Sequence, residues 1–170
     1  MYNSRIFAII DVQNVFLNNE NEFLVERIRK FIEEKRDFFH SIVLFKFVNF
    51  PGSIFVNNLN YSKAMLPQET EVAEPLKNFS SNIFRRTTFS IFTPEFVEYL
   101  KNLKDPEVFL SGLDSDACVM ASAYHGFDLG YKIKIIGDLI YSKNSEYNFF
   151  SLKILNRNLH PLVIKSEDIV

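Results

Sequence analysis

The sequence predicts an α/β fold: a single domain over residues 1–170, doubly wound around a mostly parallel six-stranded sheet with helices on both faces. Short apolar runs alternate with helical hydrophobic patterns along the chain, and most connections between them are only a few residues long. The content of 47% hydrophobic and 15% aromatic residues is ample for one core of ordinary size.

The first strand, helix and second strand follow from simple patterns. Arg5–Ile10 is a nearly continuous apolar run that ends at Asp11, which is typical of a central parallel strand covered on both faces. Residues 21–39 place apolar side chains at steps of three and four, with acids early and bases late, and this predicts an amphipathic helix. The apolar run 41–48 predicts the second strand.

Residues 49–81 are expected to form a loop at the rim of the sheet. Pro51, Gly52, Pro67 and Pro75 interrupt the segment, which leaves room for at most one short helix near residues 69–77. No substrate-selecting pattern is recognisable in it.

The remaining elements alternate regularly. Thr93 and Pro94 are good residues for the N-cap and first position of a helix, and Gly130 is a good terminator for another. We expect strands at residues 82–86, 107–110, 132–136 and 161–164, and helices from residue 94, at residues 115–129 and at residues 144–156.

Charge and composition exclude several classes of protein. The net charge of -2, with acids and bases interleaved, provides no basic surface for nucleic acid or for an anionic membrane. The N-terminal apolar run is too short to span a bilayer and has no cleavage site of the secretory kind. One cysteine in 170 residues then predicts a cytoplasmic protein.

The candidate site lies where several strands end. In a doubly wound sheet, ligands bind beyond the carboxyl ends of the strands, and Asp11, Arg86 and residues 112–118 all lie at or beyond the carboxyl end of a predicted strand. If Ser115 caps its helix, Cys118 takes the third helical position, where free N–H groups favour a thiolate. Asp114 and Asp116 would oppose this if they point inward, and a packing role for the sulfur stays open.

Asp11 and Arg86 each allow more than one interpretation. Asp11 either caps a turn or, partly desolvated, serves as a base for the thiol. Arg86 stays charged in any setting, so it can hold Asp11 but cannot accept a proton. The three histidines, His40, His125 and His160, lack metal-binding spacing, and no glycine-rich phosphate loop is present.

Three segments together resemble the isochorismatase-like cysteine hydrolases: AIIDVQNVF at 8–16, RTTFSIF at 86–92 and GLDSDACVMASAYHGFDLGY at 112–131. The resemblance spans nearly the whole chain and implies a Rossmann-like layering. It also implies Asp11 as general base, Gln13 shaping the site and Cys118 as nucleophile. The backbone amides of Asp114 and Cys118 would form the oxyanion hole, next to a cis peptide bond between Leu113 and Asp114.

The sequence departs from the family pattern in the segment that matches its basic residue. Arg86 stands where the family has lysine, Phe89 where it has tyrosine and Ile91 where it has alanine. An arginine keeps the charge but spreads it over a rigid planar fork. Metal-binding family members carry an aspartate and two histidines after the second strand, and residues 46–55 supply none, so neither a metal nor another cofactor is expected.

The expected activity is hydrolysis of a small amide or related C–N bond through a thioester acyl-enzyme. Two alternatives stay open: a catalytically impaired member that binds a small molecule or protein partner, and a vinyl-ether hydrolase of the isochorismate kind. Family members usually associate, so a homodimer or homotetramer is expected. The pocket wall is expected to comprise Gln13, Phe16, Phe50, Phe55, Phe89, Phe92, Ser122 and Tyr124.

Overall fold

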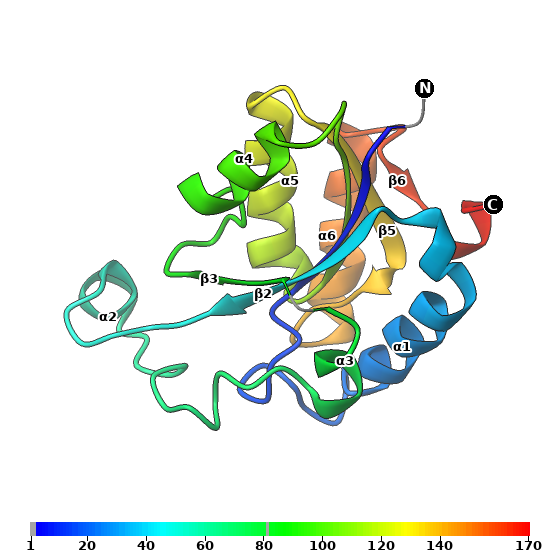
Figure 1. Cartoon of the computed structure of the whole chain (residues 1–170). Coiled ribbons are helices and arrows are strands. Elements are labelled where there is room, and N and C mark those ends of the chain that lie inside the picture. The colour runs from blue at the N-terminus through cyan, green and yellow to red at the C-terminus, as the bar shows by residue number, and fades with distance from the viewer. Residues whose placement is uncertain (1–2, 81) are drawn as a thin grey trace.

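The computed structural model describes residues 3–80 and 82–170 and has six parallel strands in the order β3-β2-β1-β4-β5-β6 (Figure 1). The predicted fold class is confirmed, and every strand pair is parallel. Met1, Tyr2 and Ser81, which the predicted domain and rim include, lie outside the described residues. The strands are β1 Arg5–Ile10, β2 Ser41–Phe47, β3 Asn82–Arg86, β4 Glu107–Gly112, β5 Lys132–Ile140 and β6 Val163–Ile164.

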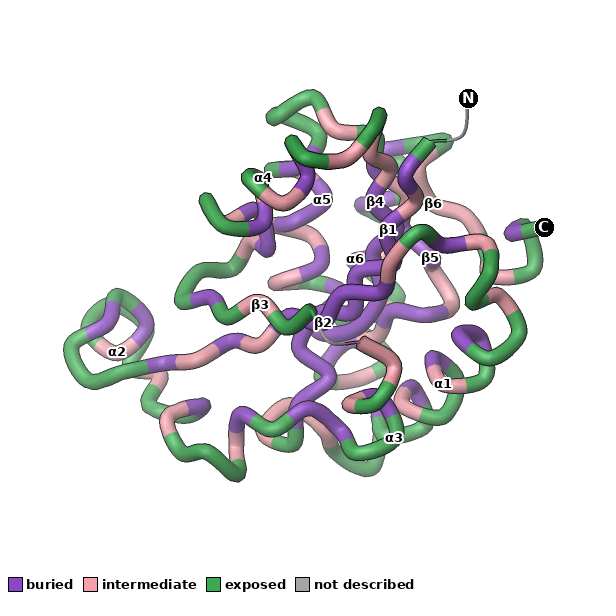
Figure 2. The backbone as a smooth tube through the Cα atoms, viewed as in Figure 1, coloured by how far each residue is buried: buried purple, intermediate pink, exposed green. Residues whose placement is uncertain are grey.

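Alternate residues of β1 enter two separate cores, which explains why its sequence is apolar throughout. Ile6 and Ile10 pack into a core covered by α4 Pro94–Lys101, α5 Met120–Asp128 and α6 Ser145–Asn158. Phe7 and Ile9 pack into a core on the opposite face, under α1 Phe23–Lys35 and α3 Glu74–Lys77. Figure 2 shows the buried strands running through the centre between these helix layers.

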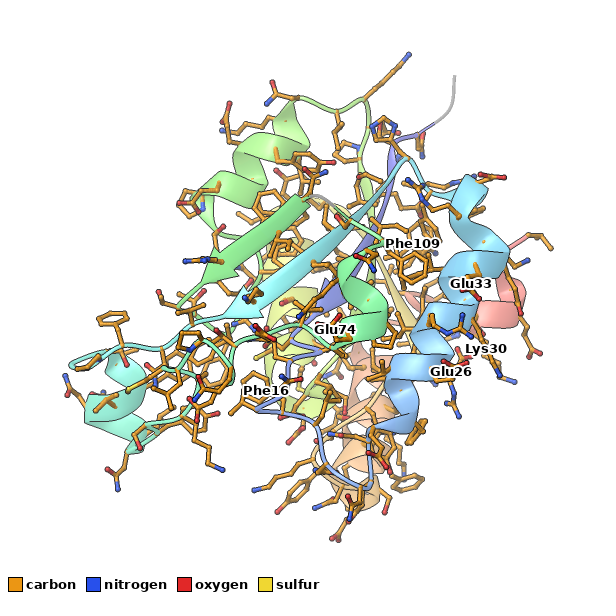
Figure 3. All side chains as sticks on the ribbon, turned by 60° about the horizontal axis from the view of Figure 1, so that its bottom comes forward. Phe16, Glu26, Lys30, Glu33, Glu74 and Phe109 are labelled. Atoms are coloured by element: carbon orange, nitrogen blue, oxygen red, sulfur yellow. The ribbon has the colours of Figure 1, made fainter. Side chains whose placement is uncertain are left out.

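Helix α1 shows how an amphipathic pattern becomes a packed layer. Its buried residues are Leu24, Ile28, Phe31 and Ile32. Glu26, Lys30 and Glu33 lie on its outer face, whereas Phe109 of β4 belongs to the core beneath it (Figure 3). The expected helix over residues 21–39 ends earlier as an α-helix and continues as one 3₁₀ turn at Arg36–Phe38. No helix among the described residues is both long and apolar enough to cross a membrane.

The rim contains two short helices, so the prediction of at most one was wrong. In addition to α3, α2 spans Ile54–Leu59. The Ser53 hydroxyl accepts a hydrogen bond from the Val56 N–H at its start, and Asn60 ends it in the left-handed conformation. Pro51 and Gly52, just before this segment, favour a loop there, although Ser53 and Asn60 are good caps.

Strand β5 runs to Ile140, four residues past its predicted end. The pairing of β4 with β5 shifts register between Leu110, which pairs with Ile135, and Gly112, which pairs with Ile140, so the irregularity lies in β5 and the strand continues past it. Strand β6 is shorter than predicted because only Val163 and Ile164 pair with β5.

The winding of the chain reverses between the neighbouring strands β1 and β4. Such a switch point leaves a crevice beyond the carboxyl ends of the two strands. Gly112 makes the close approach of the two strand ends possible, because a Cβ there would lie 2.1 Å from the Ile10 carbonyl oxygen. Asp11 and the segment that leads to Cys118 therefore begin at this crevice.

Candidate functional site

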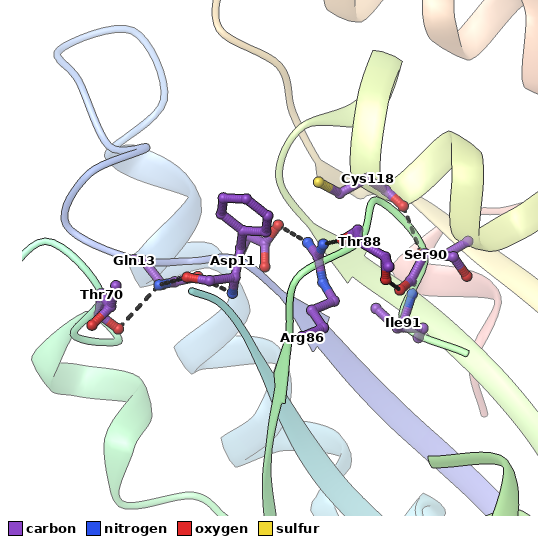
Figure 4. Close-up of polar contacts among 10 residues, drawn as sticks. Asp11, Gln13, Thr70, Arg86, Thr88, Ser90, Ile91 and Cys118 are labelled. Atoms are coloured by element: carbon purple, nitrogen blue, oxygen red, sulfur yellow. Dashed lines mark hydrogen bonds and ion pairs between the residues drawn. The ribbon is translucent and has the colours of Figure 1, made fainter. Parts of the chain in front are cut away.

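A buried ion pair occupies the switch point. Arg86, the last residue of β3, donates from Nη2 to Oδ2 of Asp11 and from Nη1 to the Thr88 carbonyl oxygen (Figure 4). Both side chains are nearly inaccessible, at 0% exposed for Arg86 and 2% for Asp11. Asp11 itself has a positive φ of 53°, a backbone state uncommon for a residue other than glycine. Asp11 Oδ1 and Arg86 Nε are buried and have no hydrogen-bond partner among the described residues.

Cys118 lies beside this pair, with its sulfur on the same side as the Asp11 carboxylate in Figure 4. The structure thus brings Asp11, Arg86 and Cys118 together from three separate parts of the chain. Burial raises the pKa of the Cys118 thiol above its usual value, and the Asp11 charge raises it further, while Arg86 opposes the change. The resting sulfur is therefore a thiol, and a base is needed to generate the thiolate.

The same environment acts on the base candidate. Burial raises the pKa of Asp11, and Arg86, hydrogen bonding with Cys118 and the Phe47 backbone partly offset this. Both the acid and the thiol are thus shifted toward their neutral forms. A carboxyl with a raised pKa is a better proton acceptor than an ordinary surface carboxylate.

The segment before Cys118 differs from the expected helix start. Ser115 does not act as the N-cap: Asp114 holds that position, and Ser115 bonds the hydroxyl of Ser151 at 2.6 Å. The first turn, Ser115–Val119, is a π-helix. This was not predicted, since a π turn has no distinct hydrophobic period.

The π turn changes which backbone groups are available at the sulfur. The Asp114 carbonyl oxygen accepts from Ala117 N–H at 3.0 Å and from Val119 N–H at 3.1 Å, the residues on either side of Cys118. The N–H of Asp114 has no acceptor among the described residues. The Leu113–Asp114 peptide bond is cis. Such N–H groups near a nucleophile are the kind that stabilise an oxyanion.

A cavity of about 220 Å³ reaches the sulfur from the rim side. Phe16, Phe55 and Phe89 line it as expected, and Asp114, Ala117 and Cys118 form its floor. Ring contacts hold the wall together. The ring centroid of Phe55 lies 4.7 Å from that of Phe47 and 4.8 Å from that of Phe89. Asp11 and Arg86 do not line the cavity, although both interact with the Cys118 side chain.

Five residues expected in the pocket wall do not line this cavity. The Gln13 amide is engaged in bonds with the backbone of Phe47 and Thr70, so it ties β2 to the rim. The Ser122 hydroxyl donates to the Cys118 carbonyl oxygen at 2.6 Å. Phe92 packs in the core, Tyr124 accepts a bond from Asn158, and Phe50 is 48% exposed outside the cavity.

Three lining residues were not anticipated from the sequence: Phe47, Leu59 and Tyr61. Phe47 ends β2, so the rule that sites follow strand ends could have identified it. Leu59 and Tyr61 depend on α2 and its cap, which the expectation of a loop at the rim obscured.

The residues present do not fit a metal ion. Among residues 3–80 and 82–170, no three His, Cys, Asp or Glu side chains are grouped so that they could hold one. His40, His125 and His160 are all exposed.

The sequence matches known proteins along most of its length. A family model for the Isochorismatase domain matches residues 5–166. Isochorismatase domain-containing protein 2 of Xenopus laevis is 28% identical over 100 residues, which cover 58% of this chain and 46% of that protein. The chain spans about half the length of the curated relatives it matches.

Solved structures share the architecture at low identity. An isochorismatase-like hydrolase from Alkaliphilus metalliredigens superposes with a TM-score of 0.82 at 16% identity, covering 97% of this chain and 96% of that one. N-carbamoylsarcosine amidase from Thermoplasma acidophilum gives 0.79 at 18% identity, covering 96% and 97%. At such identities these matches establish the fold.

Proposed function

The chain belongs to the isochorismatase family, and on this premise we propose that it is a cysteine-dependent hydrolase of a small amide or related C–N bond. The observation that carries the proposal is the position of Cys118, at the floor of a small cavity and against the Asp11–Arg86 pair. A nucleophile, a base and a group that orients the base are what covalent catalysis requires.

Asp11 is the proposed general base, and its two oxygens have separate roles. Oδ2 is engaged by Arg86, whereas Oδ1 has no partner among the described residues. Oδ1 is thus the oxygen left to take the thiol proton. Burial raises the pKa of both groups, so the thiol depends on this base to form its thiolate.

The reaction then has two halves. The sulfur attacks the carbonyl carbon, the C–N bond breaks, and Asp11 returns its proton to the departing nitrogen, which leaves a thioester on Cys118. The backbone N–H groups of Asp114 and Cys118 stabilise the oxyanion, a contribution of about 3 kcal/mol per donor. Water, deprotonated by Asp11, attacks the thioester, and the acid leaves as Cys118 recovers its proton.

Arg86 is proposed to orient the base. Its two bonds, to Asp11 and to the Thr88 carbonyl, fix the guanidinium in one plane. A lysine would have to reach both acceptors from one ammonium nitrogen, whereas the guanidinium uses two separate nitrogens. The arginine therefore keeps the charge that the family lysine provides and places it in a planar fork.

The test combines turnover with thiol reactivity. The protein is incubated with a panel of small amides, and ammonia or amine release is measured beside labelling of Cys118 by iodoacetamide. We expect turnover of at least one amide, and its loss in Cys118→Ala. Glu98→Ala, at an exposed side chain of α4, is a surface control that leaves the sulfur unchanged. An unlabelled Cys118, with product release unaffected by Cys118→Ala, would overturn the proposal.

A binding-only role is the second candidate, favoured by the engaged state of Arg86. If the arginine holds Asp11 too firmly for proton transfer, Arg86→Lys should create or greatly increase hydrolysis. If the native chain already turns over an amide and Arg86→Lys lowers the rate, the binding-only role is excluded.

We also propose that residues 1–170 act as one domain in the cytoplasm, as a homodimer or homotetramer. The lone free cysteine fits a reducing compartment. Tyr147, Phe149, Phe150 and Ile154 of α6 are each 45–56% exposed, and such an apolar surface suits an interface between copies. Light scattering coupled to size-exclusion chromatography tests this, and a monomer at micromolar concentration would contradict it.

A further inference from the structure

We propose that the Asp114 side chain selects the substrate, and that the cavity accepts a small flat amide carrying a cationic nitrogen. The inference rests on the proposed function, because it concerns the same cavity. It assigns the Asp114 carboxylate a role separate from that of its backbone N–H.

Asp114 is the one carboxylate near the sulfur that lacks a partner among the described residues. Asp11 is paired with Arg86, and Asp116 accepts a hydrogen bond from the Ser142 hydroxyl. Oδ1 of Asp114, in contrast, is buried and unpaired. A carboxylate oxygen that is buried without a donor is costly, so its presence in a ligand cavity points to a donor on the ligand.

The remaining cavity wall suits a flat cation. Its lining residues are aromatic or apolar apart from Asp114 and Cys118, and none of those described carries a positive charge. Aromatic faces attract a cation that is held near them. An anionic substrate would meet the Asp114 carboxylate with no lining cation to offset it. The volume of about 220 Å³ restricts the ligand to roughly one ring and its substituents.

The charge state of Asp114 makes the selection dependent on pH. Burial and the charges of Asp116 and Asp11 raise the pKa of Asp114 to about 7, and Lys143 opposes them. Tyr61 and Cys118 also line the cavity, and both stay neutral near pH 7 because their pKa values are raised. A cationic ligand favours ionised Asp114, so its affinity should rise as pH increases from 6 to 8.

The experiment uses three probes of similar size: 4-(aminomethyl)benzamide, 4-ethylbenzamide and 4-carboxybenzamide, which are cationic, neutral and anionic at pH 8. Binding is measured calorimetrically on the Cys118→Ala protein, so that it does not depend on turnover. Asp114→Asn is added to remove the carboxylate charge at nearly constant shape. Asp116→Asn is the matched control, since it removes an equal charge only two residues from Asp114. The Asp116 side chain is exposed and lies outside the cavity.

We expect the cationic probe to bind about tenfold or more tightly than the neutral one, as a charge-assisted hydrogen bond implies. Asp114→Asn should reduce this ratio to about twofold or less, and Asp116→Asn should largely retain it. Equal binding of the cationic and neutral probes at pH 8, or a preference that survives Asp114→Asn, would overturn the inference. If Asp114→Asn does not fold, the pH series decides: a cation preference that does not grow between pH 6 and 8 also overturns it.

Failure of the two proposals is distinguishable. Turnover by the unmodified chain without a cation preference would refute only the selection by Asp114. A cation preference in the Cys118→Ala protein, with no turnover by the unmodified chain, would refute only the hydrolase.

Discussion

Replacing Arg86 with methionine should strongly destabilise the protein at neutral pH, because it leaves the Asp11 carboxylate buried without a counter-charge. The side chains of Arg86 and Asp11 are 0% and 2% exposed, so water cannot substitute for the missing partner. Methionine is unbranched, apolar and able to fill irregular space, which limits the packing change. Breaking a buried pair from one side costs about 3–5 kcal/mol. This is a large part of the free energy of unfolding of a typical domain, which is about 5–15 kcal/mol.

The pH dependence of this loss has a defined sign. The pKa of Asp11 is already raised in the folded protein, and the loss of Arg86 removes the main opposing effect. A carboxyl whose folded pKa lies above its unfolded value favours the folded state at low pH and loses that contribution as pH rises. The deficit of Arg86→Met should therefore be largest at pH 7–8 and shrink toward pH 4–5.

A double-mutant cycle separates the pair from the packing. Asp11→Asn leaves Arg86 unpaired, whereas Asp11→Asn with Arg86→Met removes both charges. We expect the double variant to be less destabilised than the sum of the single variants by about 1–3 kcal/mol. Urea unfolding followed by circular dichroism at pH 7 gives the loss of stability of each single variant and of the double variant. A loss below about 1 kcal/mol for Arg86→Met, or strict additivity, would refute the buried pair.

Three further predictions concern the groups around the pair. Asp11→Asn should abolish turnover because it removes the proposed base. The same change should speed iodoacetamide labelling of Cys118 at pH 8, because the Asp11 charge raises the thiol pKa and Arg86, which lowers it, remains; slower labelling would contradict this. Because the pKa of Asp114 is raised to about 7 in the folded protein, the unmodified chain should lose stability as pH rises from about 4 to 7, by at most about 1.4 kcal/mol per pH unit. Asp114→Asn should remove this contribution and flatten the slope measured by urea unfolding, and an unchanged slope would argue against it. Gly112→Ala should lower the free energy of unfolding by about 3 kcal/mol or more in the same assay, because its Cβ would meet the Ile10 carbonyl. Gly130→Ala has open space around it and only a positive φ to strain it, so it should cost about 1 kcal/mol. Equal losses would show that the close approach at Gly112 is not limiting.

Much of the architecture followed from local pattern. The apolar run Arg5–Ile10 had to be a central strand because both its faces are apolar, and its residues do enter two cores. The order of strands and helices implied a switch point, which places Asp11 and residues 112–118 at one crevice. The rim was less predictable, because Pro51 and Gly52 obscured the capped helix α2.

The sequence alone determined which chemical groups stand at the strand ends: an acid, a guanidinium and a single thiol, in an α/β chain. Only the tertiary structure decided which atoms of those groups are paired and which are left without a partner, since hydrogen-bond partners and burial depend on segments far apart in sequence. Among the described residues, Asp11 Oδ2 pairs with Arg86 while Oδ1 has no partner, and Asp114, directly before the π turn at Ser115–Val119, has a buried Oδ1 that is also unpaired. Charge and desolvation act over a few ångströms in space, so only the folded arrangement determines them.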